Sequence, residues 1–272
     1  MSLVDNSVAM ARLRDWQQDH AAALFDAKIS NVGPRDVTIV CYFYRQSDMV
    51  YEHFPFLEFA IRQTWMWCGF MKTVLVTNDF HERIRSFQMS FPEWVTVQVE
   101  PELEPGDLNA MSVDCNSKLH TRFTTKYVLI VQDDGFPLRN GLEKFLRKYD
   151  FVGGALRRDI PIVSVVGRLV RHWPSNGGFS LRTNKICRLA AEYWRRYYAG
   201  RPFDVWQSED MFYTDTLPRE HLLFRWRVHV AESDIASRFS YDGSIPGNIR
   251  ADVFGFHSAR AFLELQKLGA VI

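Results

Sequence analysis

The sequence predicts an α/β fold built on a mostly parallel central sheet with helices on both faces. Its first half alternates β-favouring runs with segments of helical periodicity, which is the order that βαβ units produce. Those runs are continuously apolar rather than alternately apolar and polar, as is typical of parallel strands buried on both faces. The second half has shorter runs and longer loops, where we expect antiparallel strands and a smaller, mixed region.

The elements of the first half follow from periodicity and composition. Residues 8–28 are expected to be helical because Val8, Leu13 and Leu24 recur at roughly helical spacing. Strands are expected where β-branched and aromatic residues cluster, as in VTIVCYFY from residue 37. In chain order we then predict strand 37–44, helix 55–68, strand 72–79, strand 95–99, helix 108–123 and strand 127–132.

The second half is expected to contain fewer and shorter strands. The elements predicted there are helix 140–149, strand 151–156, strand 178–182 and helix 184–198. No internal repeat, low-complexity tract or linker separates the halves, so we expect residues 1–272 to form one domain.

The overall composition excludes several classes of protein. The net charge of the 272 residues is +1, which argues against a uniformly basic nucleic-acid binder. No apolar run reaches the ~20 residues of a membrane span, and the first residues do not resemble a signal peptide. The four cysteines are scattered without a CxxC pair, which favours a reducing compartment. We therefore expect a cytoplasmic protein.

Three strand ends carry polar residues, at the edge where ligands collect in parallel sheets. These ends are Tyr44-Arg45-Gln46, Thr77-Asn78-Asp79 and Gln132-Asp133-Asp134. Adjacent buried carboxylates repel each other, and a divalent cation such as Mn²⁺ or Mg²⁺ relieves that repulsion. A metal-bridged diphosphate therefore fits the third strand end. The alternative is an Asp-Asp-Gly turn whose aspartates cap backbone donors.

Three later motifs also carry chemistry. Gly177 and Gly178, in PSNGGFSLR, permit a close backbone approach to a ligand, or simply form a hairpin turn. In QSEDMFY, Glu209 and Asp210 include a candidate general base, or only favour a helix N-terminus. His257 lies among phenylalanines in FGFHS and is either a core residue or a metal ligand.

The motifs YVLIVQDDGF, YDFVGGAL, NGGFSLR, SED, ASRFSYD and FGFHS occur in this order. The ordered set resembles a family of bacterial and viral proteins assigned as glycosyltransferases of GT-A-type fold. That family is long catalogued as a domain of unknown function and is often associated with surface-polysaccharide synthesis. Its motifs read approximately VLIVQ-x-DGF, YDYIGAPW, VGNGGFSLR, PED, ADRFSFE and FGFHG. The resemblance covers roughly residues 37–262 and implies a GT-A-like fold.

The resemblance implies a metal site at Asp134, the acid of the Q-x-D motif, and at His257, the C-terminal histidine. Either Mn²⁺ or Mg²⁺ would there face the diphosphate of a nucleotide-sugar donor. Gln132 takes the place of the first acid of the DxD motif found in other GT-A enzymes, so Asp133 is an extra carboxylate. Whether Asp133 joins the metal shell stays open at this point.

The resemblance also implies how the sugar and the acceptor are handled. Asn176, Gly177 and Gly178 would form the loop under the sugar. Asp210, with Glu209 beside it, would supply the base of an inverting transfer to a glycan or lipid-linked saccharide. In a retaining enzyme of this fold, Asp210 would only orient the acceptor. GGALRRD, at residues 153–159, departs from the family's GAPW-like segment, which leaves the sugar and acceptor preference open.

The half of the chain at about 35–135 is then expected to bind the nucleotide, and the half at about 136–265 the acceptor. Candidate donor-binding residues are Tyr42, Tyr44, Arg45, Asn78, Asp79 and Lys118, with Arg168 and Arg171 near the glycine loop. The basic segments 157–171 and 195–201 are solvated faces or form a peripheral contact at the inner face of a membrane.

Three other functions fit parts of the sequence. A nucleotidyltransferase of related fold needs a glycine-rich basic loop after the first strand, where this chain reads YFYRQSD. A phosphatase of the haloacid-dehalogenase type needs D-x-D-G-T/V near its N-terminus, which QDDGF does not supply. A non-catalytic sugar- or nucleotide-binding protein is the third alternative, although the motif acids Asp134 and Asp210 are present.

Overall fold

We describe the protein from a computed structural model. The described residues are 6–27, 29, 31–44, 49–155, 175–204, 207–217, 228–243 and 249–271. Several predictions concern residues outside these ranges: Arg45, Arg168, Arg171, the basic segment 157–171 and most of the GGALRRD segment.

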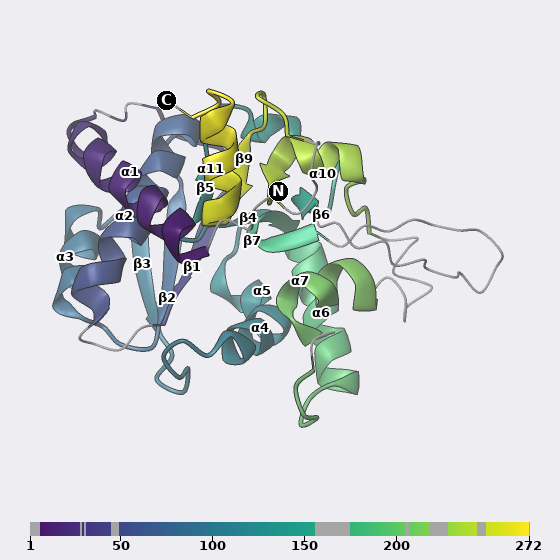
Figure 1. Cartoon of the computed structure of the whole chain (residues 1–272). Helices are drawn as coiled ribbons and strands as arrows, with labels where there is room; N and C mark the ends of the chain where they lie inside the picture. Colours follow the sequence, from purple (N-terminus) through teal and green to yellow (C-terminus); the bar gives the residue numbers. More distant parts are fainter. Residues whose placement is uncertain are drawn as a thin grey trace.

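The central sheet has six strands in the order β3-β2-β1-β4-β7-β6 (Figure 1). Its first four strands are parallel to one another, whereas β7 runs antiparallel to both β4 and β6. The bounds are β1 Val37–Phe43, β2 Lys72–Thr77, β3 Val95–Val99, β4 Tyr127–Ile130, β6 Phe151–Ala155 and β7 Ser175–Thr183. The predicted α/β class, with its parallel half and its smaller mixed region, is confirmed.

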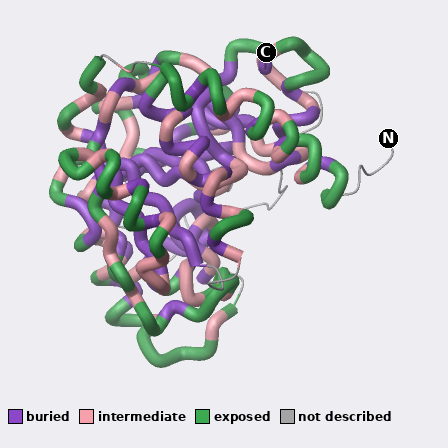
Figure 2. Tube along the Cα trace, turned by 90° about the vertical axis from the view of Figure 1, so that its left-hand side faces the viewer, coloured by how far each residue is buried: buried purple, intermediate pink, exposed green. Residues whose placement is uncertain are grey.

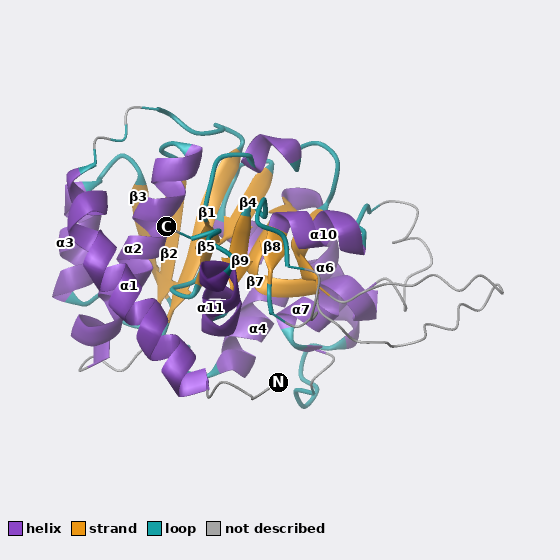
Figure 3. Cartoon of the chain, turned by 45° about the horizontal axis from the view of Figure 1, so that its top comes forward, coloured by secondary structure: helices purple, strands orange, loops and turns teal. Residues whose placement is uncertain are grey.

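Each face of the sheet has its own apolar core, and β1 shows how the sequence produces them. Successive strand residues point to opposite faces. Ile39 and Cys41 therefore enter the core shared with α2 Val50–Cys68. Val40 and Tyr42 enter the core shared with α4 Leu108–Ser117 and α6 Asn184–Tyr197. All seven residues of β1 are buried, which explains its continuously apolar sequence. Figure 2 shows the buried residues gathered in the interior, and Figure 3 shows helices on both sides of the strands.

The remaining helices complete the two outer layers. Their bounds are α1 Asn6–Asp26, α3 Glu82–Ser90, α4 Leu108–Ser117, α5 Leu119–Arg122, α6 Asn184–Tyr197, α7 Glu209–Met211, α10 Ser233–Phe239 and α11 Ala259–Lys267, with a π-helical turn at Phe212–Thr216. Helix α1 packs against α11, so the first and last helices of the described chain lie side by side (Figure 1). None of the helices in the described part of the chain has the length and apolar character needed to cross a membrane.

A second, small sheet was not predicted. It has the order β5-β9-β8, with bounds β5 Gly135–Pro137, β8 Ser240–Tyr241 and β9 Gly255–His257. Strands of two or three residues are too short to show a period in the sequence. The pairing of β5 with β9 places Gly135 opposite His257 and thereby connects two motifs far apart in the chain.

The predicted helix at 140–149 is wrong. Only the single turn Leu142–Lys144 is helical there, as a 3₁₀ helix. Gly141 and Arg147 have φ values of +135° and +67°, which no right-handed helix contains. The predicted helix at 108–123 is divided into α4 and α5 at Lys118.

Candidate active site

A cleft of about 930 Å³ lies at the carboxyl edge of the parallel strands, as expected for a sheet of this kind. Tyr42 and Tyr44 from the end of β1 line it, together with Gln132, Asp133 and Asp134, which come shortly after β4. Helices α1 and α2 and the start of α4 supply the rest of its wall. The structure thus brings the polar ends of β1 and β4 to one cavity.

Two tyrosines form one wall of the cleft. The Tyr42 hydroxyl donates to Asp114 Oδ2 at 2.9 Å, and the two rings lie 5.7 Å apart in an edge-on arrangement. Burial raises the pKa of both tyrosines, so both are neutral phenols. The Tyr44 hydroxyl is buried without a hydrogen-bond partner among the described residues. Buried polar groups are nearly always hydrogen-bonded, so this hydroxyl is an exception in the cleft wall.

A tight turn after β4 separates the two adjacent carboxylates. Gln132 and Gly135 exchange backbone hydrogen bonds of 3.1 Å, which close the turn. Asp133 Oδ2 pairs with Arg14 of α1 at 2.5 Å. Asp134 Oδ1 instead lies 3.6 Å from His257 Nε2. The turn therefore directs one carboxylate to the N-terminal helix and the other to β9.

His257 is the centre of the polar cluster at this site. Its Nε2 lies 2.9 Å from Gln132 Oε1, and its Nδ1 lies 3.3 Å from Asp242 Oδ2. Burial by itself would lower the pKa of His257, but Asp134 and Asp242 outweigh it and raise that pKa to about 9. Both ring nitrogens face acceptors, which favours the protonated imidazole as long as no metal ion is bound. Burial raises the pKa of Asp134, and the charge of His257 opposes this shift.

Asp242 is a site residue that the sequence interpretation missed. Its side chain is only 8% exposed, and it fixes the ring of His257 from the side opposite to Asp134 and Gln132. The ASRFSYD motif that contains it was noted as part of a family pattern, without a role for this residue. The ASRFSYD motif is therefore the sequence feature from which a role of Asp242 could have been predicted.

The glycine loop lies against the polar cluster. A Cβ atom at Gly178 would lie 2.2 Å from His257 Nε2 and 2.5 Å from Gln132 Oε1. A Cβ atom at Gly177 would lie 2.0 Å from the Glu209 carboxylate. A side chain at either position would therefore displace Glu209, or His257 and Gln132. The loop is held in place by Asn176, whose Oδ1 accepts from Gly178 N at 2.7 Å.

Glu209 pairs with Arg182, another residue that the sequence interpretation did not single out. Arg182 is fully buried, forms an ion pair with Glu209 and donates to Gly177 O at 3.2 Å. Burial raises the pKa of Glu209 against the charge of Arg182, whereas Glu209 raises the pKa of Arg182 against burial. The pair is ionised, because a guanidinium keeps its proton at ordinary pH. Glu209 therefore has a structural partner beneath the glycine loop.

Asp210 is held differently. Its Oδ1 accepts hydrogen bonds from Ser208 Oγ at 2.8 Å and from Met211 N at 2.7 Å. Within the described residues, Oδ2 accepts none, and the residue is partly exposed. Of the two predicted acids, Asp210 is thus the one with an oxygen available to a ligand.

Lys118, Asn78 and Asp79 do not line the cleft, and neither do Asp210, His257 or the Asn176–Gly178 segment. Lys118 is 49% exposed and pairs with Glu102 at 3.2 Å and with Glu100 at 3.7 Å. Asn78 and Asp79 follow β2, and neither is part of the cleft wall. Arg45 lies outside the described residues.

The donor set near His257 fits a divalent cation that is completed by a ligand. Across the described ranges, no three His, Cys, Asp or Glu side chains converge as a ready-made metal cage. However, Mg²⁺ is commonly held by one or two side chains plus substrate phosphates and water. Two ligands at its bond length of ~2.1 Å lie roughly 3.0–4.2 Å apart, depending on the angle between them. The 3.6 Å separation of Asp134 Oδ1 and His257 Nε2 lies within that range. A carboxylate that orients a metal-binding histidine is also usual, and Asp242 is so placed.

The solved structures that are similar to this chain include a mannosyltransferase and a core-mannan synthase. One is the mannosyltransferase PcManGT from Pyrobaculum calidifontis in complex with GDP-mannose and Mn²⁺. Its TM-score is 0.39 at 16% identity, over 76% of this chain and 62% of that chain. The other is core-mannan synthase A (CmsA/Ktr4) from Aspergillus fumigatus in its Mn/GDP form. Its TM-score is 0.43 at 10% identity, over 71% of this chain and 70% of that chain. These likenesses assign no activity to this chain.

Comparison with curated protein sequences gives no match. One family model matches residues 107–257, and its description reads "Protein of unknown function (DUF5672)". The matched segment runs from the start of α4 to His257 and includes Gln132, Asp134, the glycine loop and Asp210. Because it covers more than half of the chain, the protein belongs to the DUF5672 family.

Proposed function

We propose that this protein is a metal-dependent glycosyltransferase of GT-A-like fold. In this proposal it moves a sugar from a nucleotide-diphosphate donor to a hydroxyl of a glycan or lipid-linked saccharide. The observation that carries the proposal is the contact between three motifs: the Gln132–Asp134 strand end, His257 and the Asn176–Gly178 loop. They meet at the carboxyl edge of the parallel strands, next to a cleft large enough for a nucleotide.

The donor would bind with its nucleotide in the cleft. Tyr42 and Tyr44 present ring surfaces and a buried hydroxyl there, suited to a base or a ribose. Asp134 and His257, with the Gln132 amide oxygen, would hold Mn²⁺ or Mg²⁺ next to the diphosphate. The ion, when bound, would act as a Lewis acid that stabilises the charge of the leaving diphosphate.

Asp133 has a separate role in this proposal. Its carboxylate pairs with Arg14, and its carbonyl oxygen accepts from Gln17 Nε2 at 2.9 Å. Both contacts attach α1 to the turn that carries Asp134. We therefore assign Asp133 to the positioning of this turn rather than to the metal shell.

The acceptor side depends on Asp210. Hydrogen bonds from Ser208 and from the backbone of Met211 fix its Oδ1, so that Oδ2 can accept the proton of an acceptor hydroxyl. The backbone at Gly177 and Gly178 would lie under the sugar, where a side chain does not fit. Attack from the face opposite to the leaving group would invert the anomeric carbon.

Thermal unfolding with a panel of nucleoside diphosphates and nucleotide sugars, each with and without Mn²⁺, tests the proposal. A ligand at 100 times its Kd stabilises the folded state by about 2.7 kcal/mol. We expect one nucleotide class to raise Tm only when Mn²⁺ is present. The wild-type enzyme should also hydrolyse the nucleotide sugar of that class slowly, because water can react in place of the acceptor. The nucleoside diphosphate released measures this hydrolysis.

Matched variants show which carboxylate the Mn²⁺-dependent shift in Tm requires. Asp134→Asn should abolish the Mn²⁺-dependent shift, whereas Asp133→Asn should keep its metal dependence while lowering Tm slightly. Asp19→Asn, at an exposed position of α1 outside both the cleft wall and the other pocket, is the control for a lost carboxylate. If no nucleotide raises Tm under any condition, or if Asp134→Asn responds like the wild type, the proposed metal–diphosphate site does not exist.

A further inference from the structure

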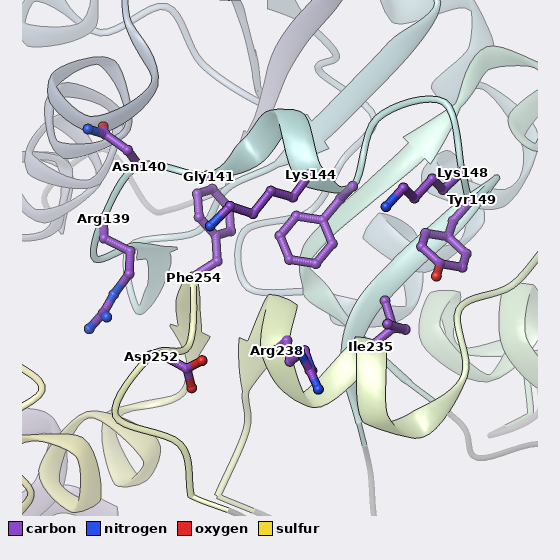
Figure 4. Close-up of a pocket in the computed structure, with 11 residues that line it drawn as sticks. Arg139, Asn140, Gly141, Lys144, Lys148, Tyr149, Ile235, Arg238, Asp252 and Phe254 are labelled. Carbon is purple, nitrogen blue, oxygen red and sulfur yellow. The ribbon is translucent and has the colours of Figure 1, made fainter.

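A second pocket, of about 300 Å³, lies between the segment that follows β5 and helix α10 (Figure 4). Four of its lining side chains are cationic: Arg139, Lys144, Lys148 and Arg238. Figure 4 shows Lys144 and Lys148 on one side of the pocket and Arg238 on the other. Cations from two separate segments of the chain therefore surround one hollow.

The charge of this basic pocket is not balanced. Its one lining carboxylate, Asp252, already accepts two hydrogen bonds from Arg250, at 3.0 and 3.2 Å. That contact lowers the pKa of Asp252, which keeps the carboxylate ionised and engaged. In the part of the chain that the structure describes, no carboxylate pairs with any of the four lining cations. Clustered like charges repel, and a bound anion would relieve that repulsion.

Arg139 gives an independent indication of a missing partner. Its Nε is buried and has no hydrogen-bond partner among the described residues. Buried polar groups in proteins are nearly always hydrogen-bonded, and an unpaired donor on a charged group is especially unfavourable. A guanidinium offers parallel N–H groups that match the oxygens of phosphate.

The floor of the pocket is apolar and firmly packed. Phe145 and Phe254 are both buried, with ring centres 5.8 Å apart. Each also packs against the ring of Phe239, at 5.0 and 5.5 Å respectively. A fixed aromatic floor beneath a cationic rim suits a ligand that joins a compact anion to an apolar or ring-shaped part.

We propose that this basic pocket binds a phosphate or diphosphate group carried by a small molecule or by a lipid headgroup. It is separate from the candidate active site. Phe254 precedes the β9 strand that ends at His257, so at ~3.4 Å per residue their Cα atoms lie roughly 10 Å apart along the strand. The two sites thus share the small sheet β5-β9-β8 but lie at opposite ends of it.

Titration with inorganic diphosphate at low salt, followed by calorimetry, tests the pocket directly. EDTA is present throughout, so that a metal-bridged diphosphate in the cleft does not contribute. The test variant carries Lys148→Gln and Arg238→Gln, which remove two exposed cations from opposite walls. We expect its Kd for diphosphate to rise about tenfold or more, since each lost charge-assisted hydrogen bond weakens binding by that order.

The matched control carries Arg12→Gln and Lys267→Gln, which remove two exposed cations from α1 and α11, outside the pocket. Its Kd should stay within about twofold of the wild type. In a second arm, the same proteins are sedimented with phosphatidylcholine vesicles with or without phosphatidic acid. Binding to free diphosphate indicates a soluble phosphorylated ligand, and binding only to the anionic vesicles indicates a headgroup. Equal binding by the test and control variants, or no binding in either arm, would overturn the proposal.

Discussion

Neighbouring residues with the same side chain have different environments at this site. Asp133 pairs with Arg14, whereas Asp134 lies beside His257, because the turn at residues 132–135 directs them apart. The sequence predicted two acids at a strand end, but it could not distinguish their partners. Arg14 is 119 residues away from Asp133 along the chain, and no local pattern connects them.

His257 should give the metal-free protein a pH-dependent stability. Its folded pKa of about 9 lies above the ordinary value of 6.5, so the protonated ring stabilises the folded state. This contribution is fully present below pH 6.5 and is lost as the pH rises through about 9. We expect the free energy of unfolding to fall over that range by up to about 3 kcal/mol. Urea denaturation in EDTA at several pH values measures it.

A comparison of variants assigns that pH dependence to one ring. His257→Gln should remove most of the decline between pH 6.5 and 9, and Asp242→Asn should reduce it, because one of the acceptors that hold the proton is lost. His229→Gln is the control, since this histidine is exposed and is not part of the cluster around His257. An unchanged decline in His257→Gln would show that other groups cause it.

At the scale of elements, strand β7 contributes and positions several residues of the site. It contributes the glycine loop at its beginning and Arg182 near its end, and it pairs with both β4 and β6. The predicted strand covered only residues 178–182, because glycines in a sequence suggest a turn. In the structure Gly177 and Gly178 are strand residues whose missing side chains admit Glu209 and His257. Close packing, rather than turn geometry, explains these two glycines.

The buried Arg182–Glu209 pair should show strong and non-additive effects on stability. Glu209→Gln leaves a guanidinium buried without a counter-charge, which typically destabilises a protein by about 3–5 kcal/mol. The double variant with Arg182→Met and Glu209→Gln removes both charges and should be more stable than Glu209→Gln alone. Urea denaturation of both single variants and the double variant gives the coupling energy.

An exposed ion pair serves as the reference for this comparison of single and double variants. Arg250 and Asp252 are 37% and 66% exposed, so Arg250→Gln should change the free energy of unfolding by less than about 0.5 kcal/mol. Additive effects of Arg182→Met and Glu209→Gln would mean that the two side chains do not depend on each other in the folded protein.

At the scale of the whole molecule, the sequence predicted local features well and distant pairings poorly. The four parallel strands were found because each is a continuous buried run of its own, as in VTIVCYFY. The small sheet was missed because β5 and β9 are three residues long and 120 positions apart. Arg182 and Asp242 were missed for a similar reason, since each has a role only through a partner brought near by the fold. The predicted contact of Asp134 with His257 came from the ordered motifs, not from periodicity.

The same long-range dependence predicts that the segment matched by the family model does not fold alone. In residues 107–257 strand β4 would lose its neighbour β1, which pairs with it from Val37↔Tyr127 to Val40↔Ile130. The apolar residues of β4 would then lie at an open edge. One core would also lose α1, α2 and α11, and the other would lose Val40 and Val76. The length of this fragment, 151 residues, does not by itself prevent folding, because many domains have ~150 residues.

We expect the circular dichroism of the fragment to show no cooperative thermal unfolding, whereas the full chain unfolds in a sharp transition. A fragment that unfolds cooperatively near the Tm of the full chain would contradict this, and would show that the family segment forms its own core.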